Sequence, residues 1–487
     1  MNKHFGFSVV LLLLINSTIS FAQKNTSVLD NKIDQVEHNL GSWVQIEGAP
    51  KWALQDRMKH HNVKGVSIAV IKDYKIEWAK GYGWADSAEK RPVTVHTLFQ
   101  ACSNSKSLNA IGVLKLVQDG KLNLNEDINT YLKSWEFPYD SLSKGKKITT
   151  ANLLSHTAGL SVDGFIGYNK KDSLPTVIQV LDGERPANSE PVRSNSEPGL
   201  KFQYSGGGTT ISQLIIEDLS GEPYDKYMYK NVLQPIGMTE SFFTQPPPSE
   251  KQNLLATGYY NDGKEVDGEY NLYTEKAAAG LWTTPTDLAK YVIETQLSLQ
   301  GKSNKVLSEK MTQLRLTPYI DSSAALGCFI VNKNGAKYFE HGGGNIGFIS
   351  QYFGSIENGN GVVIMINDDS NSNGRQLLWE IINSVAYTYN WPNFYTPIIK
   401  KEIIVDKNKL DDYVGTYKIK DFSILVTKKT DGLWLTMSGS TCKMHFTDNS
   451  NFFIYESVEG NFDFLLNDQH KITTLVINKK YKANKVE

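Results

Sequence analysis

The chain has 487 residues and a formal net charge of -1, with 40% hydrophobic and 21% charged residues. This composition is typical of a globular protein of two or three domains, and the near-neutral charge argues against nucleic acid or an anionic membrane as partner. Three cysteines do not make a disulfide framework, and the motifs of phosphate-binding loops and zinc hydrolases do not occur, so neither a cofactor nor a metal is expected.

The first 22 residues have the pattern of a secretory signal peptide. Lys3 lies in a short polar start, residues 5–15 form a continuous apolar run, and the small residues Ser20 and Ala22 occupy the positions that a signal peptidase reads. The run is shorter than the roughly 20 residues that a membrane span needs. We therefore expect cleavage near Ala22, export to a periplasm or the medium, and no stable membrane insertion.

The next segments alternate between strand and helix patterns. Residues 23–46 are polar and are expected to form a loose lead-in. Residues 65–86 read as two strands joined by a turn. Residues 103–119 read as a helix, because apolar residues recur every three positions and Gly120 can end it. Residues 160–200 are rich in Asp, Asn, Ser, Gly and Pro, which indicates a long excursion such as the wall or lid of a site.

Helices and strands separate clearly in the second half of the chain. A short helix is expected after Thr149 or Thr150, and a long one after Thr284 or Thr286. Further helices are predicted over residues 207–220, 223–236 and 377–390, with a loop over 245–252. After residue 320, short apolar runs have the spacing of hairpins in an antiparallel sheet.

A change of character follows residue 390. Residues 391–402 are a credible linker, and residues 403–487 contain seven short apolar runs, most of them separated by Asp, Asn, Gly or Ser. That spacing is typical of an all-β sandwich or barrel.

The pattern Ser-x-x-Lys is the first candidate for chemistry. It occurs at Ser87, Ser103, Ser141, Ser143 and Ser440. Only Ser103 opens a long amphipathic helix, where Lys106 would lie on the same face, about 5–6 Å away between Cβ atoms. An uncharged lysine amine can accept the serine proton, and a helix N-terminus favours a developing alkoxide. Spacing alone leaves open a surface pair without function.

Two glycine-rich segments are further candidates. The segment KFQYSGGGTT (201–210) places a tyrosine and a serine before three glycines, and EHGGGNIGF (340–348) lies within the strand pattern. Consecutive glycines indicate close approach of a backbone or a ligand. Each segment taken alone also fits an ordinary turn.

Taken in order, these segments resemble the serine β-lactamase-like family, the group of class C β-lactamases, D,D-peptidases, D-aminopeptidases and related esterases. The resemblance covers roughly residues 48–390 and rests on SNSK (103–106), NLLSHTAGL (152–160), YSG (204–206), AAAGLWTTPTDLA (277–289) and HGG (341–343). It implies an α+β fold for residues 47–390, with an antiparallel sheet flanked by helices and a helical subdomain. The DYVGTY opening of residues 403–487 resembles the lipocalin-like or barrel-like domains often appended to this family.

The resemblance also implies roles for three side chains. Ser103 would be the acylated nucleophile, Lys106 would share its proton, and Tyr204 would be the second proton-transfer group. Cys102, next to the serine, is expected to be a buried small hydrophobe rather than a nucleophile. His156 is expected to have a structural hydrogen-bonding role.

The substrate-binding strand and the oxyanion hole follow from the same resemblance. His341 and Gly343 belong to the triplet that corresponds to the family's Lys-Thr-Gly or His-x-Gly strand. The backbone N–H groups of Ser103 and Gly344 would form the oxyanion hole. Two departures stand out, because Gly206 replaces the asparagine of the usual Tyr-x-Asn and His341 replaces a permanently charged lysine.

These departures favour the esterase or small-peptidase side of the family. We expect an exported serine hydrolase that cleaves an ester or amide of a small molecule, a peptide or a β-lactam-like compound through an acyl-enzyme on Ser103. The alternatives are a β-lactamase or D-alanyl-D-alanine carboxypeptidase proper and, in a different class, an inactive binding or sensor module that keeps the fold.

Overall fold

The computed structural model describes residues 27–369, 374–437, 440–454 and 462–486. The chain divides into two compact units, one formed by residues 55–378 and the other by the residues up to 54 together with those from 379 onward. The expected signal peptide, residues 1–22, lies outside the described residues. Within the described part, no helix has the length and apolarity that a membrane span requires.

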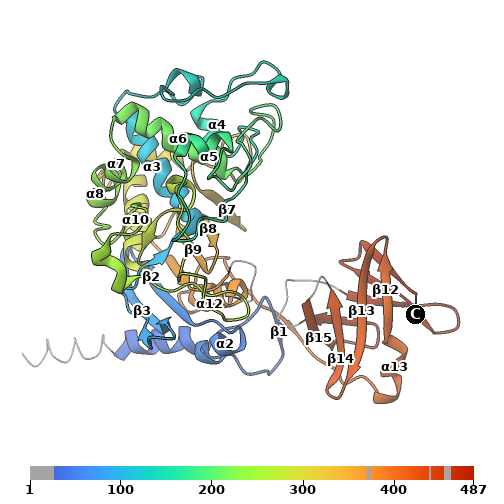
Figure 1. The fold of residues 1–487 in the computed structure, drawn as a ribbon. Coiled ribbons are helices and arrows are strands. Elements are labelled where there is room, and N and C mark those ends of the chain that lie inside the picture. Colours follow the sequence, from blue (N-terminus) through green and yellow to red (C-terminus); the bar gives the residue numbers. More distant parts are fainter. Residues whose placement is uncertain (1–26, 370–373, 438–439, 455–461, 487) are drawn as a thin grey trace, which may run out of the picture. The chain divides into compact units, whose positions relative to one another are not determined.

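A seven-stranded antiparallel sheet is the centre of the first unit (Figure 1). Its strand order is β4-β3-β2-β10-β9-β8-β7. The central strands β2 and β10 are buried along almost their whole length, which explains their nearly continuous apolar sequences. The strands are β2 (Gly65–Lys72), β3 (Lys75–Asp86), β4 (Arg91–Pro92), β7 (Phe329–Lys333), β8 (Ala336–Asn345), β9 (Phe348–Ser355) and β10 (Gly361–Ile366).

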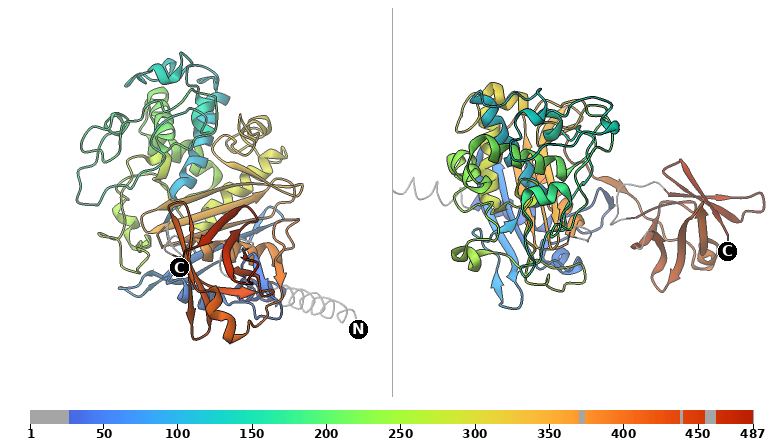
Figure 2. Two further views of the ribbon diagram at one scale, coloured as in Figure 1. Left: turned by 90° about the vertical axis from the view of Figure 1, so that its right-hand side faces the viewer. Right: turned by 45° about the horizontal axis from the view of Figure 1, so that its top comes forward.

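Helices cover this sheet and build a helical part beside it (Figures 1 and 2). Helix α10 packs on β2, β3, β9 and β10, whereas α3 packs on α6, α7 and α9. The helices of this unit are α2 (Leu54–His60), α3 (Ser105–Gln118), α4 (Thr150–Leu154), α5 (Val177–Asp182), α6 (Gly206–Ser220), α7 (Tyr224–Met228), α8 (Gln234–Ile236), α9 (Lys276–Ala279), α10 (Pro285–Leu299) and α11 (Glu309–Arg315). Helix α12 (Gly374–Thr388) crosses the boundary between the two units.

Side-chain caps start the helices close to where the sequence predicts. Thr149 forms a capping box with Asn152 at the start of α4, and Thr284 caps α10 by accepting a hydrogen bond from the Asp287 N–H. Ser205 caps α6 by accepting from the Gly208 N–H at 2.9 Å. These caps satisfy backbone donors that a helix leaves without partners in its first turn.

Some expected elements differ from the structure. The helix predicted over 223–236 is divided into α7, a π-helical segment η4 (Tyr229–Leu233) and α8. Pro235, which has no backbone N–H, lies in the last of these pieces. The loop predicted over 245–252 overlaps the 3-10 helix η5 (Ser249–Leu254).

The lead-in and the linker are also more ordered than predicted. Residues 27–38 are helical, and β1 (Val44–Ile46) pairs in parallel with β11 (Ile398–Lys400), which lies inside the expected linker. Val36 and Leu40 are each 1% exposed. Their helical spacing is a burial signal that the polar average composition of the segment hides.

The second unit contains a closed eight-stranded antiparallel barrel, coloured orange to red in Figure 1. Its strands are β12 (Gly415–Ile419), β13 (Phe422–Lys429), β14 (Gly432–Met437), β15 (Ser440–Phe446), β16 (Asn451–Ile454), β17 (Phe462–Leu466), β18 (Ile472–Ile477) and β19 (Tyr481–Lys485), after the short helix α13 (Leu410–Tyr413). The sequence predicts seven of these strands and misses β19, which closes the barrel by pairing with both β18 and β12. Tyr417, Phe452 and Phe464 help to fill the barrel core.

Candidate active site

Ser103 lies in a tight turn between strand β5 (Phe99–Gln100) and helix α3. The turn is the 3-10 helix η1 (Cys102–Asn104). The Ala101 N–H donates to Leu281 O at 2.8 Å, and the Ser105 hydroxyl donates to Cys102 O at 2.6 Å. Ser103 is half-buried while both neighbours are fully buried, so the turn presents this serine at the surface of the fold.

Cys102 does not compete with Ser103 as a nucleophile. Its side chain is completely buried, and its Sγ donates to Gln100 O at 3.3 Å. Burial raises the pKa of this thiol to about 12. A thiol with so high a pKa forms almost no thiolate at neutral pH, so Cys102 is the buried small residue that the sequence predicts.

Lys106 connects the serine to a neighbouring backbone carbonyl. Its side chain is only 4% exposed. The Lys106 Nζ donates to Ser103 Oγ at 3.0 Å and to Ala278 O, in helix α9, at 2.8 Å. The helical spacing therefore brings the amine onto the serine, and the carbonyl fixes its direction. A lysine in this geometry can exchange a proton with the serine oxygen directly.

Tyr204 completes the cluster from the opposite side. It lies immediately before Ser205, the N-cap of α6, so the start of that helix fixes its position. The Lys106 Nζ lies 5.1 Å from the centroid of the Tyr204 ring. The structure thus brings together Ser103, Lys106 and Tyr204, although the serine and the tyrosine are 101 positions apart in the sequence.

His156 supports the tyrosine. The two ring centroids are 4.2 Å apart, and the Ser205 N–H donates to His156 Nδ1 at 3.1 Å. Burial, together with the nearby charge of Lys106, holds the pKa of this imidazole well below its ordinary value, so it stays neutral. His156 therefore makes the kind of structural hydrogen bond that the sequence suggests for it.

Strand β8 runs directly against the nucleophile turn. A Cβ atom added to Gly343 would lie 2.8 Å from Ser103 N and 2.7 Å from Cys102 Cβ, so only glycine fits there. Gly344 is the next residue of the same strand. The close approach brings the backbone of β8 to the backbone N–H of Ser103, where the expected oxyanion hole would lie.

His341 lies two residues before Gly343 on β8 and is buried and neutral. Its Nδ1 lies 2.6 Å from Gly342 O, whereas its buried Nε2 has no hydrogen-bond partner. Burial and the positive charge of Lys106 lower the pKa of His341 to about 3. Its ring centroid lies 5.3 Å from that of Phe329 and 6.4 Å from that of Tyr204.

Gly206, in the place of the usual asparagine, packs under an aromatic ring. A Cβ atom at this position would lie 3.0 Å from Asp163 O and 3.1 Å from the Phe165 ring. Sequence reasoning did not single out Phe165, Phe202 or Phe329. The only available signal was their position beside the glycine-rich and polar segments, and that does not reveal which way a ring points.

Backbone strain gathers around this cluster. Three non-glycine residues near it have left-handed φ angles: Cys102 at 53°, His156 at 57° and Val162 at 60°. The last is β-branched, for which a positive φ is a true outlier. Val162 O accepts hydrogen bonds from the Gly207 N–H at 2.9 Å and from the Ser205 hydroxyl at 3.2 Å. Strain of this kind concentrates at functional sites, where the surroundings hold it in place.

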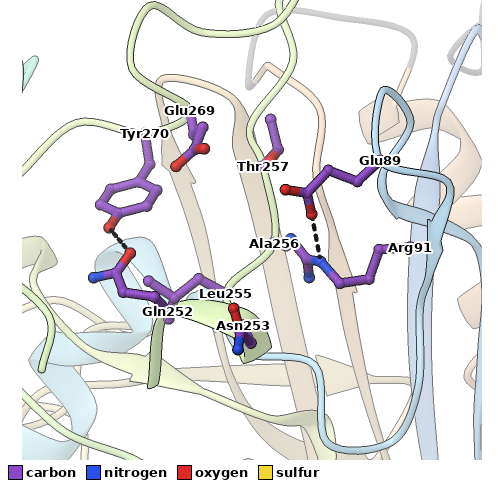
Figure 3. A pocket seen from close by; sticks show the side chains of 9 residues that line it. All are labelled: Glu89, Arg91, Gln252, Asn253, Leu255, Ala256, Thr257, Glu269 and Tyr270. Carbon is purple, nitrogen blue, oxygen red and sulfur yellow. Dashed lines mark hydrogen bonds and ion pairs between the residues drawn. The ribbon is translucent and has the colours of Figure 1, made fainter. Parts of the chain in front are cut away.

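A polar pocket in the same unit has a different lining. Figure 3 shows that it is bordered by the Glu89–Arg91 ion pair and by Tyr270, whose hydroxyl donates to Gln252 Oε1 at 3.0 Å. None of the candidate catalytic residues lines it. Among the described residues, no group of three or more His, Cys, Asp or Glu side chains is arranged to hold a metal.

Comparison with known proteins identifies the family. The model of the family described as beta-lactamase matches residues 53–387. This match covers more than half of the chain, which therefore belongs to the beta-lactamase family.

One curated relative is the protein flp of Staphylococcus aureus (strain N315). It is 27% identical over 321 residues, which cover 65% of this chain and 61% of that protein. The chain thus spans less than two thirds of the length of this relative.

Solved structures share the fold at lower sequence identity. A penicillin-binding protein homologue from Pyrococcus abyssi, described as octameric, has a TM-score of 0.61 at 23% identity, covering 89% of this chain and 98% of that one. A D-amino acid amidase from Ochrobactrum anthropi SV3, complexed with L-phenylalanine, has a TM-score of 0.57 at 20% identity, covering 74% and 99%. At these identities, the likeness shows the fold alone.

Proposed function

We propose that this protein is a serine hydrolase that cleaves an ester or amide bond through an acyl-enzyme on Ser103. The observation that carries the proposal is the hydrogen bond of 3.0 Å between Lys106 Nζ and Ser103 Oγ, with the ring of Tyr204 beside the amine. An activated serine needs a base within hydrogen-bond reach, and this pair supplies one.

The reaction proceeds in two halves. Ser103 Oγ attacks the carbonyl carbon while its hydroxyl proton passes to the Lys106–Tyr204 pair. The developing oxyanion is bound by the backbone N–H groups of Ser103 and Gly344. The bond to the leaving group then breaks, the leaving oxygen or nitrogen receives the proton, and the acyl group remains on Ser103. Water attacks the acyl-enzyme by the same route and releases the acid.

The membership of the beta-lactamase family supports this reaction type, and a D-amino acid amidase with the same fold supports an amide or ester of a D-amino acid as one substrate class. The neutral His341 in place of a lysine cation favours these substrates over β-lactams and peptides ending in D-Ala-D-Ala.

A substrate panel tests the proposal. It contains a 4-nitrophenyl ester, a D-amino acid 4-nitroanilide, a cephalosporin and a peptide ending in D-Ala-D-Ala, each with wild type and with Ser103→Ala. We expect ester or anilide turnover that the variant lacks. Faster turnover of the cephalosporin or of the peptide would establish the lactamase or carboxypeptidase alternative, and no turnover by any substrate would favour an inactive binding module.

We also propose that the protein is exported, on the signal-peptide pattern of its first 22 residues. Expression of the full chain in a bacterial host followed by intact mass of the recovered protein tests this. A mass that corresponds to a new N-terminus after Ala22 is expected, and a protein that retains all 22 residues would contradict it.

A further inference from the structure

His341 places a neutral ring, and not a charge, on the strand that runs beside the candidate nucleophile. A carbonyl oxygen only accepts, so the contact of 2.6 Å with Gly342 O requires the proton to be on His341 Nδ1. Because burial and the charge of Lys106 keep this imidazole neutral by lowering its pKa, Nε2 carries a lone pair. That nitrogen is buried without a partner. A substrate carboxylate next to His341 would therefore meet no positive charge on this side chain.

The cations around His341 are already engaged. Lys106 and Arg315 are the two whose charges shift its pKa. The Lys106 Nζ donates to Ser103 Oγ and to Ala278 O. Arg315 is 1% exposed, and its guanidinium donates to the hydroxyl groups of Tyr291 and Thr295. Both cations therefore already donate hydrogen bonds to groups of the protein itself.

The half-buried rings of Phe329 and Tyr204 lie beside the same histidine, and the ring of Phe202 lies beside that of Phe329. The Phe329 ring lies 5.3 Å from that of His341 and 5.9 Å from that of Phe202, measured between centroids. Phe329, Phe202 and Tyr204 are all only partly covered by the protein, so each still presents apolar surface. Apolar surface at a site favours an apolar part of the ligand, because burial of that surface is favourable.

We propose that the acyl group of the substrate has an apolar part and no carboxylate, that Phe202 and Phe329 contact the apolar part, and that His341 excludes a carboxylate. This inference rests on the proposed acyl-enzyme function and deepens it, because it names the substrate class of the same site. The cost of removing a carboxylate from water without a cation or donor to receive it provides the discrimination.

The test compares two esters that differ in one terminal group. 4-Nitrophenyl hexanoate and mono-4-nitrophenyl adipate have acyl chains of equal carbon number, ending in a methyl group and in a carboxylate respectively. After subtraction of the uncatalysed rate, we expect kcat/KM of wild type to favour the hexanoate by at least about 100-fold, as for a site that leaves a charge unpaired. A ratio near one, or one that favours the adipate, would overturn the inference.

Two variants assign the selectivity to residues. His341→Lys supplies a cation and should shift the ratio toward the adipate by about 10-fold or more. Phe329→Ala should lower kcat/KM for the hexanoate more than for 4-nitrophenyl acetate. Lys337→Ala, at an exposed position of the same strand β8, is the matched control and should leave the ratio unchanged. If His341→Lys does not fold, the ratio of kcat/KM for the two esters measured with wild type still tests the inference.

The failure of this inference and the failure of the proposed function look different. If a fluorophosphonate labels Ser103 and both esters are hydrolysed equally, the substrate class is wrong and the serine hydrolase function stands. If the serine is not labelled and neither ester is hydrolysed, the proposed function is wrong, and the inference falls with it.

Discussion

Gly343→Ala is the sharpest test of how the nucleophile turn is built. The added Cβ would lie 2.8 Å from Ser103 N, 2.8 Å from Ala101 O and 2.7 Å from Cys102 Cβ. All three atoms belong to the backbone or its first side-chain carbon, so none can rotate away, and β8 must separate from the turn. Overpacking of this kind costs about 1–3 kcal/mol of folding free energy.

The larger effect should be on activity. A displacement of about 1 Å at a reacting group lowers the rate by about 100-fold, so we expect the second-order rate of fluorophosphonate labelling to fall by about that factor. The free energy of unfolding, measured by urea denaturation, should fall by only about 1–3 kcal/mol. Gly164→Ala is the control, because its Cβ would meet no atom within 4 Å. Wild-type labelling by Gly343→Ala would refute the close approach of β8 to Ser103.

Three more predictions concern other parts of the chain. Lys106→Met should slow labelling by about 100-fold to 10,000-fold. Lys115→Met removes the ion pair of the same helix with Asp119, and it should leave labelling unchanged and alter stability by less than about 1 kcal/mol. Equal labelling of the two variants would exclude Lys106 as the base. Glu275, completely buried, has its pKa raised by burial from 4.5 to about 7. Its folded form keeps a proton that the unfolded chain releases between those values, so from pH 4.5 to pH 7 the stability of wild type should fall by about 3 kcal/mol more than that of Glu275→Gln. Parallel pH profiles of the two proteins from denaturation would contradict this. Phe464→Ala removes a buried ring from the barrel core and should lower the barrel's stability by about 3–5 kcal/mol in calorimetry without slowing Ser103 labelling; slower labelling would show that the site depends on the barrel.

Most helices and strands could be predicted from the sequence, because each depends on a pattern of neighbouring residues. The run of residues 65–72 is apolar because β2 is covered on both faces, and Thr284 caps α10 where predicted. Strand β19 was not predicted, because its own residues carry no such local pattern. In Tyr481–Lys485, Ala483 is the sole residue buried in the barrel, so the strand has no apolar alternation to read.

The sequence predicts the part of the candidate site that depends on side-chain type and on spacing along the chain. Ser103 and Lys106 are one helical turn apart, and the ordered motifs gave Tyr204 and His341. The partner that directs Lys106 is the backbone carbonyl of Ala278, and any residue could supply it. Phe165 over Gly206 is likewise a long-range packing fact that no local pattern encodes.

Intact-protein mass after exposure to a small fluorophosphonate tests the central claim most directly. Wild type should gain the mass of one adduct, and Ser103→Ala should gain none, because Ser103 Oγ accepts the hydrogen bond of 3.0 Å from the Lys106 Nζ that the proposed mechanism requires. An adduct on Ser103→Ala, or none on wild type, would contradict the assignment of Ser103 as the nucleophile.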